Sequence, residues 1–167
     1  MQFQKVMRLT RRDLLRFLLA AGVAGSHNAS AQEFAGERAA LRVVTVARGL
    51  EHPWGLAFLP DGRLLVTERP GRMRIIERDG KLGAALGNLP AVVAAGQGGL
   101  LDVHLDRQFA ANRTLYFSYS EAGDGGAGTS VARALLGKAA LEDVRVIFRQ
   151  GPKVRGGLHF GDRKSVV

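Results

Sequence analysis

Cysteine is absent from this 167-residue sequence. Its absence excludes a disulfide-stapled scaffold, and it excludes any thiolate site for zinc, an iron–sulfur cluster or nucleophilic catalysis. A long apolar run is also lacking near the N-terminus, where the apolar stretch at residues 17–25 is far shorter than the roughly 20 residues of a membrane-spanning helix. We therefore do not expect the chain to span a membrane.

Acidic residues are few, 15 against 24 lysines and arginines, so the formal net charge is +9. The basic residues after position 31 are scattered singly, and no run of them interleaves with aromatic residues. A nucleic-acid interface needs a clustered basic face, so we expect no nucleic-acid partner. The hydrophobic fraction of 46% is ordinary for a globular protein and excludes intrinsic disorder.

The first 31 residues have the features of an export signal. Arginines precede and border the apolar stretch at residues 17–25, and residues 28–31 supply a small-residue cleavage site. The pair Arg11 and Arg12, followed by two leucines, resembles a twin-arginine signal. These features predict a signal peptide over residues 1–31 and a periplasmic or secreted protein. An ordinary secretory signal that contains two arginines is the alternative, and it predicts the same location.

From residue 41 the pattern is typical of short β-strands joined by tight turns. Pro-Asp-Gly at residues 60–62 and Pro-Gly at residues 70–71 are turn signals, because proline pre-sets φ and glycine accepts a positive φ. We expect a loop in the glycine-rich stretch 123–128, no long helix, and at most one helical turn at residues 137–141. The expected strands are 41–46, 55–59, 64–68, 73–78, 99–105, 114–120, 130–133 and 144–148.

The strand pattern repeats. Similar openings occur at Gly55, Gly99 and Gly157, about 44 and about 58 residues apart, and we attribute the longer spacing to an insertion in the 123–128 loop. Repeats of this length, each a four-stranded meander, are the signature of a β-propeller. The predicted fold class is therefore all-β, with the first two to three blades of a propeller. A propeller needs at least four blades to close, so we expect the propeller to continue beyond this sequence.

The last six residues do not continue the strand that opens at Gly157. Residues 162–167 can be back-translated into a DNA string that matches a widely used sequencing-library adapter. We therefore expect native sequence to stop near Gly161 and residues 162–167 to be a non-native tail; an ordinary polar C-terminus is the alternative. The expected division is a signal peptide at 1–31, the N-terminal part of a propeller domain at 32–161, and this tail.

Four ordered motifs carry a family resemblance. They are GLEHPWGLAFLPDG at residues 49–62, TERPGR at 67–72, GQGGLLD at 96–102 and GGLHFG at 156–161. Together they resemble the soluble quinoprotein sugar dehydrogenases, the glucose/sorbosone dehydrogenase family that includes the aldose sugar dehydrogenases. The resemblance implies a six-bladed propeller that binds pyrroloquinoline quinone (PQQ) and calcium. It also implies oxidation of the C1 hydroxyl of an aldose to a lactone by hydride transfer to PQQ.

The resemblance assigns roles to two residues. His159 aligns with the imidazole that the family uses as general base, and a neutral histidine titrates near the working pH. Gln97 aligns with a glutamine near the sugar and the cofactor, and its amide can both donate and accept hydrogen bonds. No metal ligand is assigned in this chain, because the family's calcium ligands and most of its PQQ ligands lie in later blades. We interpret Trp54 as a core anchor, His52 as a turn residue and His104 as a packed or surface histidine.

One position departs from the family pattern. The residue before the catalytic imidazole is usually Asp or Asn in the family, whereas this chain has Leu158. The departure keeps a second hypothesis open, a non-catalytic periplasmic propeller that binds a sugar or a protein partner. The enzyme hypothesis implies an aldose substrate, an external electron acceptor and a possible homodimer at full length. The 167-residue chain alone is expected to be inactive, because most of the cofactor site lies beyond it.

Overall fold

The structure is a computed structural model that describes residues 32–35, 40–158 and 160. The predicted signal peptide (1–31), His159 and the predicted tail (162–167) lie outside the described residues. The chain divides between residues 48 and 49 into two units, which are described separately. In the first, β1 (Gln32–Ala35) pairs antiparallel with β2 (Ala40–Val43). The predicted strand at 41–46 therefore ends early, and its partner β1 was not predicted.

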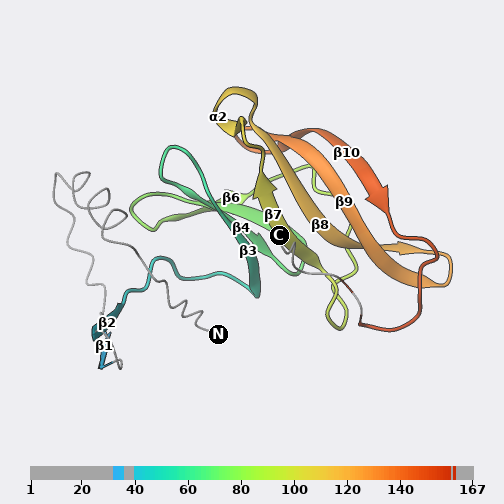
Figure 1. The fold of residues 1–167 in the computed structure, drawn as a ribbon, viewed down its shortest axis with the longest axis horizontal. Coiled ribbons are helices and arrows are strands. Elements are labelled where there is room, and N and C mark those ends of the chain that lie inside the picture. The colour runs from blue at the N-terminus through green and yellow to red at the C-terminus, as the bar shows by residue number, and fades with distance from the viewer. Residues whose placement is uncertain (1–31, 36–39, 159, 161–167) are drawn as a thin grey trace. The chain divides into compact units, whose positions relative to one another are not determined.

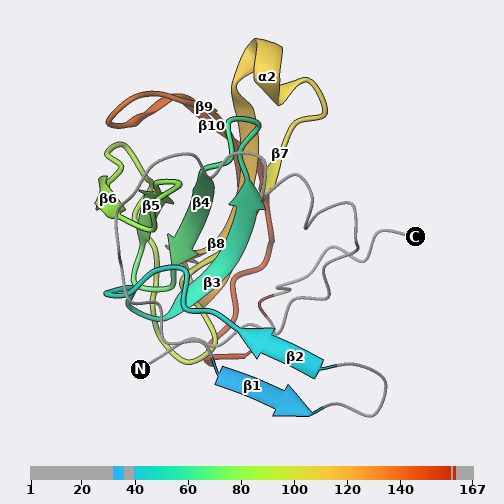
Figure 2. The ribbon, with the colours of Figure 1, turned by 90° about the vertical axis from the view of Figure 1, so that its left-hand side faces the viewer.

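The second unit begins with a four-stranded antiparallel meander (Figures 1 and 2). Its turns are where the proline and glycine signals predicted them, and Gly62 and Gly71 have positive φ values of 87° and 110°. The predicted strand at 64–68 is confirmed. The sequence did not predict where the fourth strand of this sheet lies. In spatial order the strands are β3 (Pro53–Phe58), β4 (Leu64–Glu68), β5 (Arg72–Ile76) and β6 (Leu82–Ala85).

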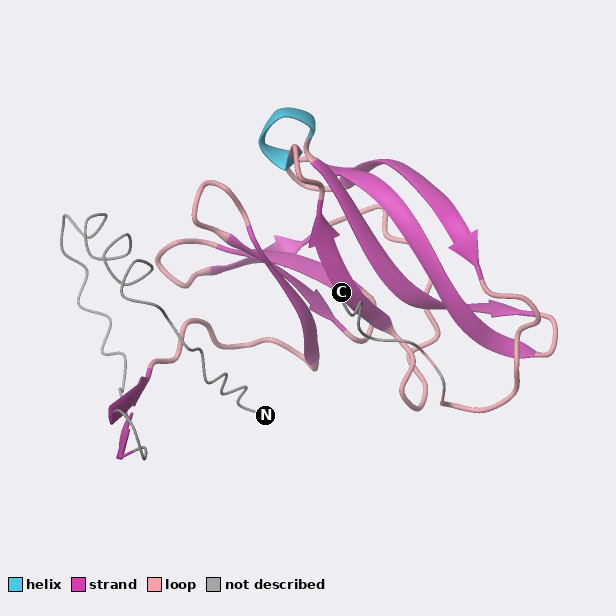
Figure 3. Cartoon of the chain, in the orientation of Figure 1, coloured by secondary structure: helices cyan, strands magenta, loops and turns pink. Residues whose placement is uncertain are grey.

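A second four-stranded antiparallel meander follows, and strands dominate the described chain (Figure 3). One helical turn, α2 (Phe109–Asn112), lies in the connection between its first two strands. The strands are β7 (Leu100–Leu105), β8 (Thr114–Gly123), β9 (Gly126–Leu136) and β10 (Leu141–Arg149).

One expectation about this sheet is wrong. The glycine-rich stretch 123–128 is not an inserted loop: β8 and β9 pair as far as Gly123↔Gly126, so it forms a tight hairpin end. The extra length of this repeat lies instead in long strands and in α2. At residues 137–141, where the prediction allowed at most one helical turn, the structure assigns none, since Leu141 already pairs with Leu136 across the β9–β10 connection.

The two sheets share one hydrophobic core. Leu65 and Met73 from the first sheet pack in the same cluster as Leu100, Phe117 and Tyr119 from the second, and all five are almost fully buried. The first strands of the two sheets approach closely, because a Cβ on Gly55 in β3 would lie 3.0 Å from the Leu101 carbonyl oxygen and 3.0 Å from the Val103 nitrogen in β7. This is the relation of two neighbouring propeller blades joined at their inner strands.

The strand order brings several connections to one end of both sheets. Pro53 pairs with Glu68 and Leu100 pairs with Tyr119, so β3 and β7 begin where β4 and β8 approach their ends. We call this the linker end. The β4–β5 turn, the linker between the sheets, the β8–β9 hairpin end and the segment after β10 all belong to it.

Candidate functional site

The site begins with the linker loop 96–99, which carries Gln97 at the linker end. Gln97 is exposed, whereas the next two residues, Gly98 and Gly99, are buried just before β7 begins. A Cβ on Gly98 would lie 2.8 Å from both the Ser120 Oγ and the Val93 carbonyl oxygen. The loop therefore presents one polar side chain on a tightly packed backbone.

Ser120 fixes this loop from the second sheet. Its fully buried hydroxyl accepts a hydrogen bond from the Gly99 N–H at 2.7 Å and donates one to the Val93 carbonyl at 2.5 Å. Backbone bonds from Val93 to Ser120 and from Ser120 to Gly99 complete the attachment. The last residue of the linker loop, Gly99, and Val93, three residues before the loop, are thus tied to the last buried residue of β8.

Arg69 holds the same loop from the first sheet. Its Nη1 donates to the Gly96 carbonyl, and its own carbonyl accepts from the Leu100 N–H at 2.9 Å. The preceding residue, Glu68, is fully buried and accepts a 2.8 Å bond from the Arg72 Nε, as well as one from the Glu51 N–H. Hydrogen bonding to Arg72 also lowers the pKa of Glu51.

The loop meets the segment that carries the second predicted site motif. The Gln97 N–H donates to the Gly157 carbonyl at 2.7 Å. A Cβ on Gly96 would lie 2.5 Å from that carbonyl oxygen, so a side chain does not fit between the two backbones. The structure therefore brings Gln97 together with the segment that contains His159, two residues after Gly157. His159 itself lies outside the described residues.

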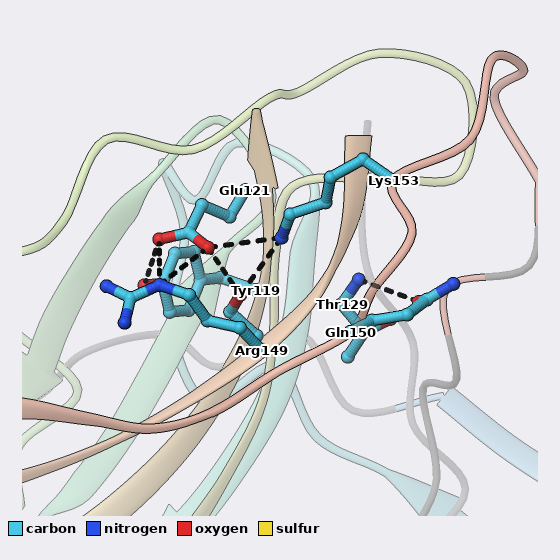
Figure 4. Close-up of polar contacts among 7 residues, drawn as sticks. Tyr119, Glu121, Thr129, Arg149, Gln150 and Lys153 are labelled. Atoms are coloured by element: carbon cyan, nitrogen blue, oxygen red, sulfur yellow. Dashed lines mark hydrogen bonds and ion pairs between the residues drawn. The ribbon is translucent and has the colours of Figure 1, made fainter. Parts of the chain in front are cut away.

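Residues 150–154 run along the β8–β9 hairpin and lead from β10 towards Gly157. We call this segment the strap. Its backbone pairs with the hairpin through reciprocal 3.1 Å bonds between Ala127 and Val154. Gln150 adds two contacts with Thr129, accepting from the Thr129 N–H at 3.1 Å and donating its own N–H to the Thr129 carbonyl at 2.9 Å. Figure 4 shows the strap residues beside the hairpin.

A charged cluster on the hairpin anchors the strap (Figure 4). Glu121 accepts hydrogen bonds from Ser130 Oγ at 2.8 Å, Arg149 Nε at 3.0 Å and Lys153 Nζ at 3.1 Å. Burial alone would raise the pKa of Glu121, but the three donors outweigh it and lower the pKa to about 2. Burial and the nearby Glu121 carboxylate raise the pKa of Tyr119.

The remaining predicted residues are placed as follows. His52 lies in a turn with φ of 47°, as expected, and His104 is exposed on β7. Trp54 is not a core anchor: it is 39% exposed, because it lies on the side of β3 that β7 does not cover. No third-blade strand is assigned among the described residues after β10. Arg69, Ser120 and Lys153 were not predicted as site supports, although Arg69 belongs to the TERPGR motif.

Other features of the described chain do not form a competing site. An open hollow at the opposite end from the linker is lined by charged turn residues, and Arg63 there pairs with Asp61 at 2.8 Å and Glu77 at 3.6 Å. Within the described residues, no cluster of three or more His, Asp or Glu side chains could hold a metal ion. The described part of the chain contains no helix long and apolar enough to cross a membrane.

Two neighbouring blades with a shared loop cluster at one end define a partial β-propeller. The sequence profile of the family described as Glucose / Sorbosone dehydrogenase matches residues 50–166. The chain therefore belongs to the Glucose / Sorbosone dehydrogenase family.

Individual relatives agree with this assignment. The chain is 46% identical to the aldose sugar dehydrogenase YliI of Escherichia coli over 129 residues, which are 75% of this chain and 35% of that protein. A crystal structure of a glucose dehydrogenase matches with TM-score 0.66 and 50% identity over 69% of this chain and 34% of that one. The PQQ-bound aldose sugar dehydrogenase of Streptomyces coelicolor matches with TM-score 0.56 and 30% identity, over 63% and 32%. The chain thus spans about a third of the length of these relatives.

Proposed function

We propose that this chain forms the first blades of a quinoprotein oxidoreductase that oxidises the C1 hydroxyl of aldose sugars to lactones. The observation that carries the proposal is the meeting of the two family motifs: the Gln97 N–H donates to the Gly157 carbonyl at 2.7 Å. Residues about 60 positions apart in the sequence thereby form one loop cluster. The names of the relatives and the PQQ-bound neighbour support the reaction class.

Each of the two site residues has a separate task in this proposal. His159 accepts the proton of the sugar hydroxyl, which a neutral imidazole can do near neutral pH. Gln97 orients a hydroxyl-rich or carbonyl-bearing ligand, because its amide both donates and accepts. Leu158 is exposed and contributes no polar group, so it does not help to hold the sugar through hydrogen bonds.

The described residues fit one side of a PQQ site. The Gln97 side chain is exposed, and the backbone that carries it is held on both sides by hydrogen bonds and tight packing. The flanking Gly96 and Gly98 have no side chains that could cover the Gln97 amide, and the packing leaves no room for any. Gln97 would contact the cofactor or the sugar beside it. When bound, PQQ supplies the hydride acceptor of the reaction. Calcium is part of the proposal only through the family, and since no described cluster fits it, no residue here is assigned to it.

We further propose that the protein is exported to the periplasm or the medium through the twin-arginine signal, passes electrons to an external acceptor and can form a homodimer at full length. The alternative, a non-catalytic propeller that binds a sugar or protein, is favoured by Leu158 alone. Leu158 stands where the family's polar residue would help to place the base.

Activity measurements on the full-length protein encoded by the gene test the proposal. The purified protein is incubated with PQQ and calcium, and dye reduction is followed with a panel of aldoses. We expect aldose-dependent turnover, a loss of at least 100-fold in kcat for His159→Ala, and a higher KM or weaker PQQ binding for Gln97→Ala. His104→Ala is the matched control, since this exposed histidine on β7 should leave turnover unchanged.

Two results would contradict the proposal. A folded full-length protein that binds an aldose but reduces no dye with PQQ present would favour the non-catalytic alternative. Turnover retained in His159→Ala would remove His159 from the reaction.

A further inference from the structure

Arg69 contacts the linker loop on both sides of Gln97. Its Nη1 donates to the carbonyl of Gly96, directly before Gln97, and its carbonyl accepts from the Leu100 N–H at 2.9 Å, three residues after it. One residue of the first sheet therefore brackets the loop. The sequence separation of about 27 residues makes this a contact between the turn of one blade and the start of the next.

Arg69 and the linker loop are tightly packed against each other. Gly99 has φ of 148°, and a Cβ added there would overlap the Arg69 carbonyl oxygen and Cγ. The loop backbone thus lies directly on both the main chain and the side-chain stem of Arg69. A shift of Arg69 must move the loop that carries Gln97.

The guanidinium of Arg69 is committed to this loop rather than to an ion pair. Arg72 and Arg74, on the next strand, both lie near the buried carboxylate of Glu68, at 2.8 Å and 4.0 Å. Arg69 forms no ion pair within the part of the chain that the structure describes; its side-chain partner there is the Gly96 carbonyl. A planar guanidinium holds a carbonyl in a fixed direction, which suits a positioning role.

Arg69 is itself fixed at its base. Its N–H donates to the His52 carbonyl at 3.0 Å, and its neighbour Glu68 is fully buried under bonds from Arg72 and Glu51. Arg69 is therefore attached to the first blade through its backbone and to the Gly96 carbonyl through its guanidinium. The position of the first blade thus determines where the loop with Gln97 lies.

We propose that Arg69 is a positioning residue for Gln97, setting the direction in which the glutamine amide meets the ligand. This inference rests on the proposed function, in which Gln97 contacts the cofactor or the sugar. Arg69 acts through Gln97 and need not touch the ligand itself. Its effect on binding should therefore disappear once the Gln97 amide is removed.

A double-mutant cycle on the full-length protein tests this dependence, with PQQ binding as the readout. We expect Arg69→Ala to weaken PQQ binding about tenfold and Gln97→Ala to weaken it by a similar factor. The double variant should be no more than about twofold weaker than Gln97→Ala, because residues that act as one unit are not additive. Arg69→Lys, which keeps a donor for the Gly96 carbonyl, should recover part of the loss. Arg63→Ala, at the opposite end of the same blade, should bind as the unchanged protein does.

Amide hydrogen exchange provides a second readout that does not need the cofactor. In Arg69→Ala the backbone N–H groups of Gln97 and Gly98 should exchange at least tenfold faster than in the unsubstituted protein. The backbone N–H of the buried Leu115 should exchange at an unchanged rate, which would show that the fold persists. Unchanged exchange at Gln97 and Gly98 would overturn the positioning role. Faster exchange with fully additive binding effects would also overturn it, since Arg69 would then act independently of Gln97. If the full-length protein without any substitution binds no PQQ, the proposed function is overturned instead.

Discussion

At the scale of single residues, Thr67 links the two blades. Its fully buried hydroxyl accepts from the Gly55 N–H at 2.8 Å and donates to the Leu101 carbonyl at 2.5 Å. The first bond lies within one sheet and the second crosses to the other. A single hydroxyl thus satisfies two buried backbone groups at the closest approach of the sheets.

Replacement of Thr67 by valine keeps the shape and removes both hydrogen bonds. We expect Thr67→Val to lower the free energy of unfolding by about 1–3 kcal/mol, because two buried backbone groups lose their partner. Urea unfolding followed by circular dichroism measures the change.

Thr129→Val is the matched control for this substitution. The Thr129 Oγ is buried and has no hydrogen-bond partner among the described residues, so its replacement should be neutral or slightly stabilising. Equal destabilisation by both variants would contradict the role of Thr67 as a bridge.

The residues of the site could be predicted separately but not as an arrangement. Gln97 and the 156–161 motif were proposed as site elements from the sequence because they match motifs of a known family. The support from Arg69 and Ser120 could not be predicted, since it depends on backbone carbonyls that are brought close only by the packing of two sheets. Trp54 was misplaced for a related reason: residue type indicates that an aromatic side chain favours burial, but not which face of a strand is covered.

At the scale of elements, the strap depends on a charged anchor. Lys153 reaches Glu121 at 3.1 Å and Ser130 at 3.4 Å, and its stem lies over the hairpin glycines. A Cβ on either Gly123 or Gly128 would come within 2.9 Å of this stem. Ion pair and packing therefore act together to hold the segment that leads to Gly157.

The strap anchor should make stability depend on acid pH. Lys153→Met should lower the free energy of unfolding by about 1–2 kcal/mol at neutral pH, because Glu121 loses a charged hydrogen-bond donor. The folded-state pKa of Glu121, about 2, lies below its ordinary value of 4.5. The stabilisation is thus present above pH 4.5 and is lost as pH falls towards 2.

The measurement is the urea unfolding midpoint of both proteins at a series of pH values. The gap between unchanged protein and Lys153→Met should narrow as pH falls from about 4.5 to about 2. Lys138→Met is the control, since Lys138 is exposed in the β9–β10 connection and has no ion pair among the described residues. A gap for Lys153→Met that stays constant down to pH 2 would indicate that packing alone holds the strap.

The sequence predicted the strands better than it predicted their ends. Residues 64–68 were predicted as observed, because a buried strand there is bounded by clear turn signals on both sides. The hairpin at 123–126 was predicted as a loop, because glycine and alanine have low strand propensity and the β8–β9 pairing overrides it. The α2 turn was not predicted, because its four residues are too few to show a helical period in the sequence.

At the scale of the whole molecule, the close approach of β3 and β7 sets the distance between the blades. Gly55 is the contact point, where a Cβ would lie 3.0 Å from Leu101 O, Val103 N and Thr67 Oγ1. Two of these are backbone atoms, which cannot rotate away. The spacing of the blades, and with it the position of the linker loop relative to Arg69, depends on this glycine.

Gly55→Ala should therefore destabilise the fold by about 1–3 kcal/mol, the range for overpacking a well-packed interior. Thermal unfolding of the unchanged and variant proteins measures the effect. Gly151→Ala is the control, because a Cβ there would meet nothing within 4 Å. A Gly55→Ala protein as stable as the control would show that the sheets can separate at no cost.

The meander topology also has a consequence for synthesis. Every strand of the two sheets pairs with a strand that is next to it in the sequence. The first sheet can therefore complete its pairing as soon as Ala85 has left the ribosome, before any residue of the second sheet is needed. Each new inner strand then docks on a surface that is already formed, so long-range contacts are added in small steps with little loop-closure entropy at each. A ring built in this way can grow blade by blade during translation, in the order in which the blades are encoded.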